Sequence, residues 1–351
     1  MAMNPLRGWD RFWFAPVSAR PLGAFRVVVG CLALVNLGFL TIDLDYWMSG
    51  VGLLQGTEAQ ELAGPLRLSP LQTFQSPLTI RVVLAAEAVA TLLFTLGWRT
   101  RLMGILVYLG QLSLHHRNIA TASGADVLLM VMLFYLMLSP CGAAYSIDAW
   151  RESRKRGTLA EPIISPWAQR LMQIQLIVMY LVSSIFKCAG TTWLTGTALH
   201  FVVCNREVGR FDIGWLAEYP AFINIATFGG LAVEFALAFL LWFKAARPWV
   251  LVAGISLHVG ILFAVNIPLF GELSMATYLL FLDSSEFAAV RRALNVRGWF
   301  RQPNPARLGK AFRIDPPAVS AIPGTHHPTD VALSTSFAWR DESDEGEQAR
   351  D

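Results

Sequence analysis

The sequence has little charge: Asp, Glu, Lys and Arg make up only 15% of its 351 residues, whereas soluble proteins average about 25%. Much of this charge lies near the C-terminus, in runs such as Arg340-Asp341-Glu342, so the chain before it is poorer still. A soluble domain needs charged side chains over its whole surface, and this scarcity argues against a soluble enzyme. With 54% hydrophobic residues and a mean hydropathy of +0.47, the sequence indicates an integral membrane protein.

Other features are also missing. The basic residues form no dense stripe with interleaved aromatic rings, so no nucleic-acid partner is expected. The four cysteines include no CxxC motif, which argues against a redox dithiol or a zinc knuckle. Cys188 and Cys204 are either paired on the outer side or, as the simpler alternative, free buried thiols. The first 20 residues lack a long apolar run, so we expect no cleavable signal peptide, and the aromatic segment 8–14 predicts an interfacial anchor.

Long apolar segments are abundant. A spanning helix needs about 20 mainly apolar residues, with about 17 as the lower end. Two of the candidates, 102–114 and 269–282, are short, so one or two spans are expected to be short or re-entrant. The predicted spans are 22–44 (with Arg26 able to snorkel near its start), 78–97, 102–114, 125–138, 167–186, 222–243, 249–267 and 269–282.

The basic residues predict the orientation of these spans. With eight spans and a cytoplasmic N-terminus, the basic clusters between spans all fall on the inner side, as the positive-inside rule requires. We therefore expect an all-α polytopic helical bundle of about eight spans with both termini cytoplasmic, in a bacterial inner (cell) membrane. The expected organisation is an interfacial segment at 1–20, a membrane domain at 21–285 and a cytoplasmic, largely disordered tail at 286–351. Two outer segments, 45–77 and 189–220, are expected to cap the outer face.

Polar side chains inside the spans are functional candidates, because each costs at least a few kcal/mol in a bilayer. We expect them to converge towards the outer side. The candidate catalytic residues are Lys187, His116, His115 and His258. The candidate pocket residues are Arg117, Asn118, Asp126, Gln173, Trp193 and Asn266.

Lys187 is the strongest of these candidates. A lysine at the end of a span usually snorkels to the headgroups, and that alternative stays open. The positive-inside rule gives no reason for a lysine at an outer end, and a desolvated lysine can act as a base near neutral pH. Glu234, near the middle of its span, is expected to be a neutral, hydrogen-bonded acid.

Structural roles compete with function at the other positions. Arg117 and Asp126 are either site residues or an ion pair that ties two helices together. His258 is either a ligand-binding residue or a bridge between helices. His115 and His116 are adjacent, so they point about 100° apart on a helix and do not both face one site. That spacing is also wrong for two metal ligands on one helix face, and no metal is predicted.

These residues, in order and spacing over 9–285, resemble the HTTM (horizontally transferred transmembrane) domain. No single motif is diagnostic; the resemblance rests on the whole set. The matching segments are 16–26, His116-Arg117-Asn118 with Gly124 and Asp126, 139–142 with 145–148, 173–175, Tyr180 to Lys187, Trp193 with 196–198, His258, and 266–270.

The resemblance implies a chemistry. The HTTM domain is the membrane core of vitamin K-dependent gamma-carboxylase, in which a lysine at the lumenal end of a span deprotonates a reduced naphthoquinone. The quinone then reacts with dioxygen to give an epoxide and a strong base, which removes a glutamate γ-proton so that CO₂ adds. Lys187 lies in the matching segment, although the carboxylase has paired lysines there and this chain has Phe186-Lys187. The family histidine matches His115, His116 or Asn118.

Two functions remain as hypotheses. The first is a quinol-dependent enzyme of carboxylase or epoxidase type, with Lys187 as its base and a reduced naphthoquinone (a vitamin K-like quinol) between the spans. The second is a non-catalytic membrane module that binds a quinone or lipid, or that partners a redox protein; no protein partner is identified. The carboxylase's large lumenal domain has no counterpart in the predicted spans and tail. A transporter is disfavoured, because matched broken spans are not evident.

Overall fold

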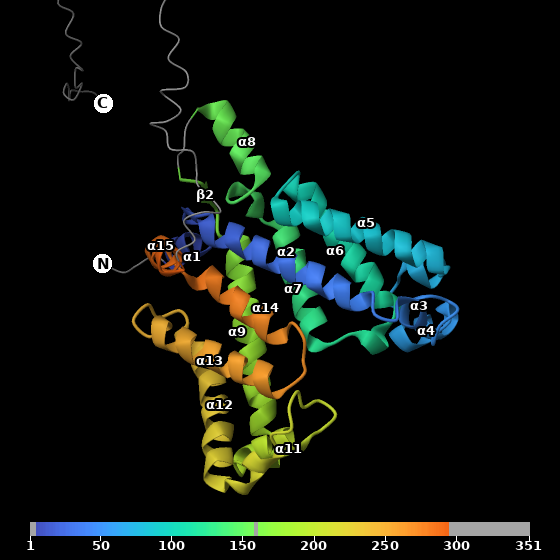
Figure 1. The fold of residues 1–351 in the computed structure, drawn as a ribbon. Coiled ribbons are helices and arrows are strands. Elements are labelled where there is room, and N and C mark those ends of the chain that lie inside the picture. Colours follow the sequence, from blue (N-terminus) through green and yellow to red (C-terminus); the bar gives the residue numbers. More distant parts are fainter. Residues whose placement is uncertain (1–4, 158–160, 295–351) are drawn as a thin grey trace, which may run out of the picture. The chain divides into compact units, whose positions relative to one another are not determined.

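The computed structural model describes residues 5–157 and 161–294. Within them the chain is almost entirely helical, with one short sheet (Figure 1). The helices are α1 (Pro5–Phe14), α2 (Arg20–Leu40), α3 (Leu44–Met48), α4 (Gly56–Ala63), α5 (Pro77–Leu96), α6 (Thr100–Arg117), α7 (Gly124–Leu138), α8 (Ile147–Arg156), α9 (Trp167–Cys188), α10 (Thr191–Leu194), α11 (Ala198–Cys204), α12 (Pro220–Leu240), α13 (Arg247–Ala264), α14 (Phe270–Thr277) and α15 (Ser284–Ala293). Short 3₁₀ helices are η1 (Pro70–Gln72), η2 (Ile119–Thr121), η3 (Cys141–Ala143), η4 (Gly214–Glu218) and η5 (Tyr278–Phe281).

Each predicted apolar segment coincides with a helix. Five helices are long and apolar enough to cross a membrane, namely α2, α5, α9, α12 and α13. The other three segments correspond to α6, to the shorter α7, and to α14 continued by η5. An all-helical fold with membrane-length apolar helices is therefore confirmed, whereas the count of eight spans and the side of each terminus stay predictions.

The predicted tail begins within a helix. α15 covers its first part, and Phe287 in that helix is buried. The rest of the predicted tail, from residue 295 onward, lies outside the described residues.

Local sequence signals set the helix ends. Ser76 caps α5 by accepting a hydrogen bond from the Thr79 backbone N–H at 3.1 Å, and Pro77 occupies the first turn, where its missing N–H costs nothing. Gly97 ends α5 at φ +72°, a left-handed conformation that favours glycine. Ser123 and Asp126 form a reciprocal capping box at the start of α7.

The helices pack in two groups, and α9, which belongs to the second group, also contacts α7 of the first. Figure 1 shows α2, α5 and α6 side by side, and α9 and α12 side by side in a second group. Phe25, Phe94 and Met132 are among the buried side chains of the first core, and Tyr180 and Leu237 are among those of the second. Lipid tails are as apolar as these side chains, so close packing and polar contacts, rather than escape from water, hold such helices together.

Arg26 does not snorkel, which corrects the prediction made for it. Its guanidinium is fully buried and donates hydrogen bonds to the carbonyl oxygens of Cys141 (2.8 Å) and Tyr145 (2.6 Å), with longer bonds to those of Ala144 and Thr95 (both 3.4 Å). These carbonyls belong to the end of α5 and to the turns after α7. Arg26 therefore connects three segments that are distant in sequence.

A two-stranded sheet lies at the end of the fold where α9 begins. β1 (Val17–Ser18) pairs antiparallel with β2 (Ile163–Ile164), so Val17 lies opposite Ile164. The pairing holds the chain between α1 and α2 against the start of α9. The predicted interfacial segment is helix α1, which leaves the rings of Trp9 and Phe14 exposed.

Candidate functional site

The centre of the candidate site is an ion pair between α9 and α12. The Lys187 ammonium, one residue before the end of α9, contacts the Glu234 carboxylate, and the Ser183 hydroxyl donates to the second carboxylate oxygen at 3.3 Å. The two charged side chains are 24% and 10% exposed. Glu234 is hydrogen-bonded, as expected, and its partners are Lys187 and Ser183.

The pair lies within the span of α12. Glu234 is fourteen residues after Pro220, the first residue of α12, which corresponds to about 21 Å along a helix. After the break at Gly190 the chain continues beside the first half of α12, where the Leu199 N–H donates to the Thr227 hydroxyl at 3.1 Å. Lys187 therefore points at a carboxylate between helices, and the geometry does not support snorkelling to headgroups.

Trp193, a predicted pocket residue, lies in the same cluster. It lies on α10, immediately after the break, and the Lys187 Nζ is 4.9 Å from the centre of its ring. An ammonium over an indole face is attracted by the negative face of the ring. Lys187 is therefore held from two directions, by a carboxylate and by an aromatic face.

His258 lies beside this cluster in a buried hydrogen-bonded chain. The Tyr180 hydroxyl is 2.7 Å from the His258 Nε2 and 2.8 Å from the Tyr278 hydroxyl, so it links α9, α13 and η5. Tyr180 is two turns before Lys187 and lies on the same face of α9. The bridge between helices considered for His258 is confirmed. Its Nδ1 is buried and has no partner among the described residues, so one ring nitrogen remains available.

The predicted residues on α6 and α7 form a separate buried cluster. Asp126 accepts a hydrogen bond from the Asn36 amide at 2.7 Å, and the His115 Nε2 is 3.7 Å from the same oxygen. One turn deeper on α6, the Gln111 side chain is fully buried, and neither of its polar atoms has a partner in the described part of the chain. The alternative of an Arg117–Asp126 ion pair is wrong, because Asp126 is engaged here.

Arg117, Asn118 and His116 hold the predicted outer cap in place. The Arg117 guanidinium donates to the carbonyl oxygens of Ser49 (3.2 Å) and Leu54 (2.8 Å). The Asn118 amide donates to the Trp47 carbonyl at 2.8 Å, and the His116 Nδ1 is 3.2 Å from the Leu68 carbonyl oxygen. His115 and His116 therefore face different partners, as helix geometry predicted.

Gln173 and Asn266 are not brought together with Lys187. Gln173 lies fourteen residues earlier on α9, where its amide donates to the Leu280 carbonyl at 2.7 Å. Asn266 follows α13, and its backbone N–H donates to the Val208 carbonyl at 2.7 Å, which ties the segment between α11 and η4 to the end of α13. The predicted convergence of these polar residues therefore does not extend to Gln173, which lies far from Lys187 along α9.

Some functional candidates were not predicted. The sequence analysis did not single out Asn36, Gln111 or Tyr278. Asn36 and Gln111 are isolated polar residues within apolar runs, and this pattern could have identified them as candidates. Cys188 and Cys204 are free thiols, and Cys204 is exposed. Within 5–157 and 161–294, no three His, Cys, Asp or Glu side chains converge as a metal ion would require.

Comparisons with known proteins agree with the helical membrane fold. A family model described as "HTTM domain" matches residues 14–285. A Bacillus subtilis (strain 168) protein named "Uncharacterized protein YitO" is 26% identical over 215 residues, which cover 58% of this chain and 68% of that protein. No solved structure matches the chain.

Proposed function

The chain belongs to the HTTM domain family, and from this premise we propose that it is a membrane enzyme that uses a reduced naphthoquinone, with Lys187 as its base. The observation that carries the proposal is the pairing of Lys187 with Glu234 between two membrane-length helices. The resemblance to the membrane core of vitamin K-dependent gamma-carboxylase supports this role, because Lys187 lies in the segment that resembles the one with that enzyme's paired lysines. We further propose that this end of α9 faces the outside of a bacterial cell membrane, because the basic clusters favour that orientation.

The pair gives Lys187 a way to become a base. In the proposed step the Lys187 ammonium passes one proton to the Glu234 carboxylate that it contacts, which leaves a free amine on Lys187. That amine accepts a proton from an acidic hydroxyl, while the Glu234 carboxyl keeps the proton that Lys187 released. The pair as a whole gains one proton, and the deprotonated group gains the balancing negative charge.

The surroundings of the pair fit an aromatic hydroxyl compound. Trp193 offers a ring face beside Lys187. Two buried polar atoms nearby have no partner among the described residues, namely Ser184 Oγ and His258 Nδ1. They lie on α9 and α13 and are able to hold hydroxyl oxygens. When bound there, a reduced naphthoquinone supplies the hydroxyl proton and the electrons that dioxygen accepts in an epoxidase- or carboxylase-type reaction.

The test measures the product formed from a reduced naphthoquinone. Membranes that contain the full chain are supplied with the quinol and air, and quinone epoxide is quantified by mass spectrometry. We expect Lys187→Ala to lower the rate by roughly 100- to 10,000-fold, the range for a general base, while Lys155→Ala on exposed α8 leaves it unchanged. Equal rates in wild type and K187A would overturn the proposal.

A second candidate function is a non-catalytic module that binds a quinone or lipid. The same ion pair favours it, because Lys187 and Glu234 satisfy each other and tie α9 to α12 without any substrate. On this alternative, purified protein retains a quinone but forms no epoxide. K187A would then lower stability without changing any turnover.

A further inference from the structure

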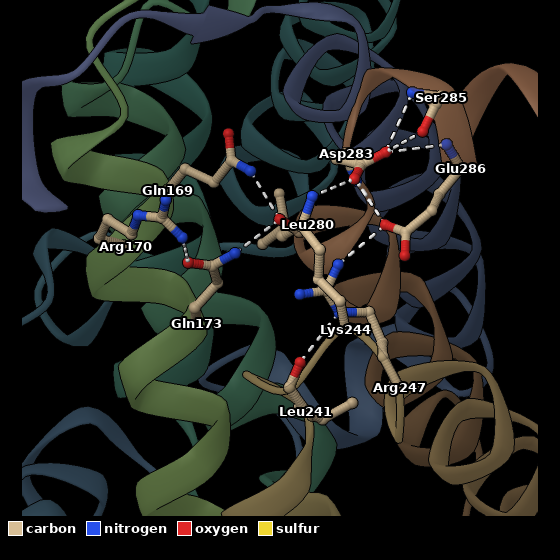
Figure 2. A network of polar contacts seen from close by, with 10 residues as sticks. All are labelled: Gln169, Arg170, Gln173, Leu241, Lys244, Arg247, Leu280, Asp283, Ser285 and Glu286. Carbon is tan, nitrogen blue, oxygen red and sulfur yellow. Dashed lines mark hydrogen bonds and ion pairs between the residues drawn. The ribbon is translucent and has the colours of Figure 1, made fainter.

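A cavity of about 510 Å³ lies at the other end of α9 from Lys187. Its walls are β1, the start of α9, the start of α13 and the turn between η5 and α15. Figure 2 shows the polar network along one side of it. The polar residues that line it include Ser18, Gln169, Arg170, Lys244, Arg247 and Asp283.

Most charges around this cavity are already paired. The Lys244 ammonium is 2.8 Å from the Asp283 carboxylate, and the Arg247 guanidinium is 2.8 Å from the Glu286 carboxylate (Figure 2). Glu161, which also lines the cavity, accepts a hydrogen bond from the Ser18 hydroxyl at 2.8 Å and lies 3.7 Å from Arg20. These pairs leave the cavity with little net charge from their members.

Arg170 is the exception. Its guanidinium donates to the neutral Gln173 Oε1 at 2.9 Å and the Phe12 carbonyl at 3.3 Å, and no carboxylate pairs with it among the described residues. The rings of Phe12 and Trp242 lie 4.9 Å and 5.7 Å from its central carbon and fix its plane. A guanidinium has five N–H donors, so most of its donors remain available. A planar, pre-oriented guanidinium is the side chain best suited to phosphate.

Gln169 supplies a second, independent observation. Its amide donates to the Leu280 carbonyl at 2.6 Å, while its Oε1 is buried and has no partner in the described part of the chain. The residue as a whole is only 6% exposed. A buried acceptor without a donor is costly, and a hydroxyl group in the cavity would satisfy it. The cavity thus combines one unpaired cation with one unpaired acceptor.

The neighbouring α1 indicates that the occupant is a lipid. Phe12, which contacts Arg170, lies on α1, and this helix exposes the rings of Trp9 and Phe14. Aromatic rings of this kind anchor helices at the headgroup level of a membrane. A headgroup that enters the cavity would keep its acyl chains beside these rings.

We infer that this cavity binds the headgroup of an anionic phospholipid, with the phosphate on Arg170 and a headgroup hydroxyl on Gln169. Phosphatidylglycerol has both groups. The same chemistry occurs in free phosphate, which lacks acyl chains. The site is independent of Lys187 and of the function proposed above.

The experiment measures lipid binding by the full chain. Protein in neutral detergent is titrated with phosphatidylglycerol, phosphatidylcholine or inorganic phosphate, and bound lipid is counted by native mass spectrometry alongside the melting temperature. Arg170→Gln is compared with Arg154→Gln, which removes an arginine that also lies over a ring (Trp150, 4.4 Å) but lies on α8 outside the cavity. We expect R170Q to bind phosphatidylglycerol roughly 10- to 100-fold more weakly, the loss of charged hydrogen bonds, and R154Q to bind it like wild type.

Each outcome decides the matter. If phosphatidylglycerol, but neither phosphatidylcholine nor inorganic phosphate, raises the melting temperature of the wild type, the lipid site is supported. If inorganic phosphate raises it equally, the ligand is a soluble anion and the lipid assignment is overturned. Equal binding by R170Q and R154Q overturns the site. Should R170Q not fold, Arg170→Lys retains the charge without the planar fork, and Gln169→Leu removes only the acceptor. Unchanged phosphatidylglycerol affinity in both would then overturn the assignment.

Discussion

Lys187 and Glu234 meet at different positions along their helices: the lysine is one residue from the end of α9, and the glutamate is fourteen residues into α12. α12 therefore extends well past the end of α9, and the segment from Gly190 to α11 covers that extension. The offset places a charged pair between apolar helices, where charges interact more strongly than at a surface.

Removing one member of this pair should leave the other charge uncompensated. We expect Glu234→Gln to destabilise the protein by about 3 kcal/mol, and the double variant with Lys187→Met to recover much of that loss. Denaturant unfolding in detergent of both single variants and the double variant measures the coupling. The exposed pair Lys244–Asp283 (74% and 34% exposed) is the matched control and should couple by less than about 1 kcal/mol.

The Tyr180 hydroxyl is hydrogen-bonded to both His258 and Tyr278. Tyr180→Phe deprives both partners of a hydrogen bond in a buried site and should cost about 1–3 kcal/mol. Tyr278→Phe leaves the bond between Tyr180 and His258 intact and should cost less. Melting temperatures of the two variants in the same detergent test the order, and a more severe effect of Y278F would contradict this arrangement.

Arg26 should not tolerate lysine. The guanidinium reaches four carbonyl oxygens with its planar set of donors, whereas an ammonium has three donors on a flexible stem. We expect Arg26→Lys to lower stability by about 2–4 kcal/mol. Arg20→Lys, at a half-exposed position paired with Glu161, is the control and should change stability by less than about 1 kcal/mol.

Asp283 should contribute to stability at neutral pH and lose that contribution in acid. Its carboxylate accepts hydrogen bonds from the Glu286 N–H, the Lys244 ammonium and Ser285, and these hold its pKa well below its usual range. A group whose pKa is depressed in the folded state stabilises it above the unfolded-state pKa of about 4, and the contribution disappears as pH falls towards the folded-state pKa. Asp283→Asn should melt lower at pH 7 and fall less steeply below pH 4 than wild type; parallel pH profiles would refute this.

Sequence alone predicted the helices better than their contacts. Apolar runs are visible in the sequence, so the predicted segment 167–186 matches α9 (Trp167–Cys188) closely. Arg26 donates to the carbonyl oxygens of Cys141 and Tyr145, which lie more than 100 residues away in the sequence. No local sequence pattern predicts these contacts. Likewise the pairing of Lys187 with Glu234 depends on the axial offset of α12, which is set by packing rather than by composition.

Gln173 shows the same limit at the other end of α9. A glutamine in an apolar helix predicts a buried polar contact, but it does not predict at which end of the bundle its partner lies. In the structure its partner is the Leu280 carbonyl, in a 3₁₀ turn whose hydrogen-bond pattern leaves that oxygen available.

That carbonyl also constrains motion. Leu280 accepts hydrogen bonds from Gln169 and Gln173, which are one turn apart on α9, so η5 cannot slide along α9 by one residue without breaking both. An axial movement of α9 relative to η5 therefore costs two hydrogen bonds at this end of the helix, in addition to any strain on the contact between Lys187 and Glu234 at its other end.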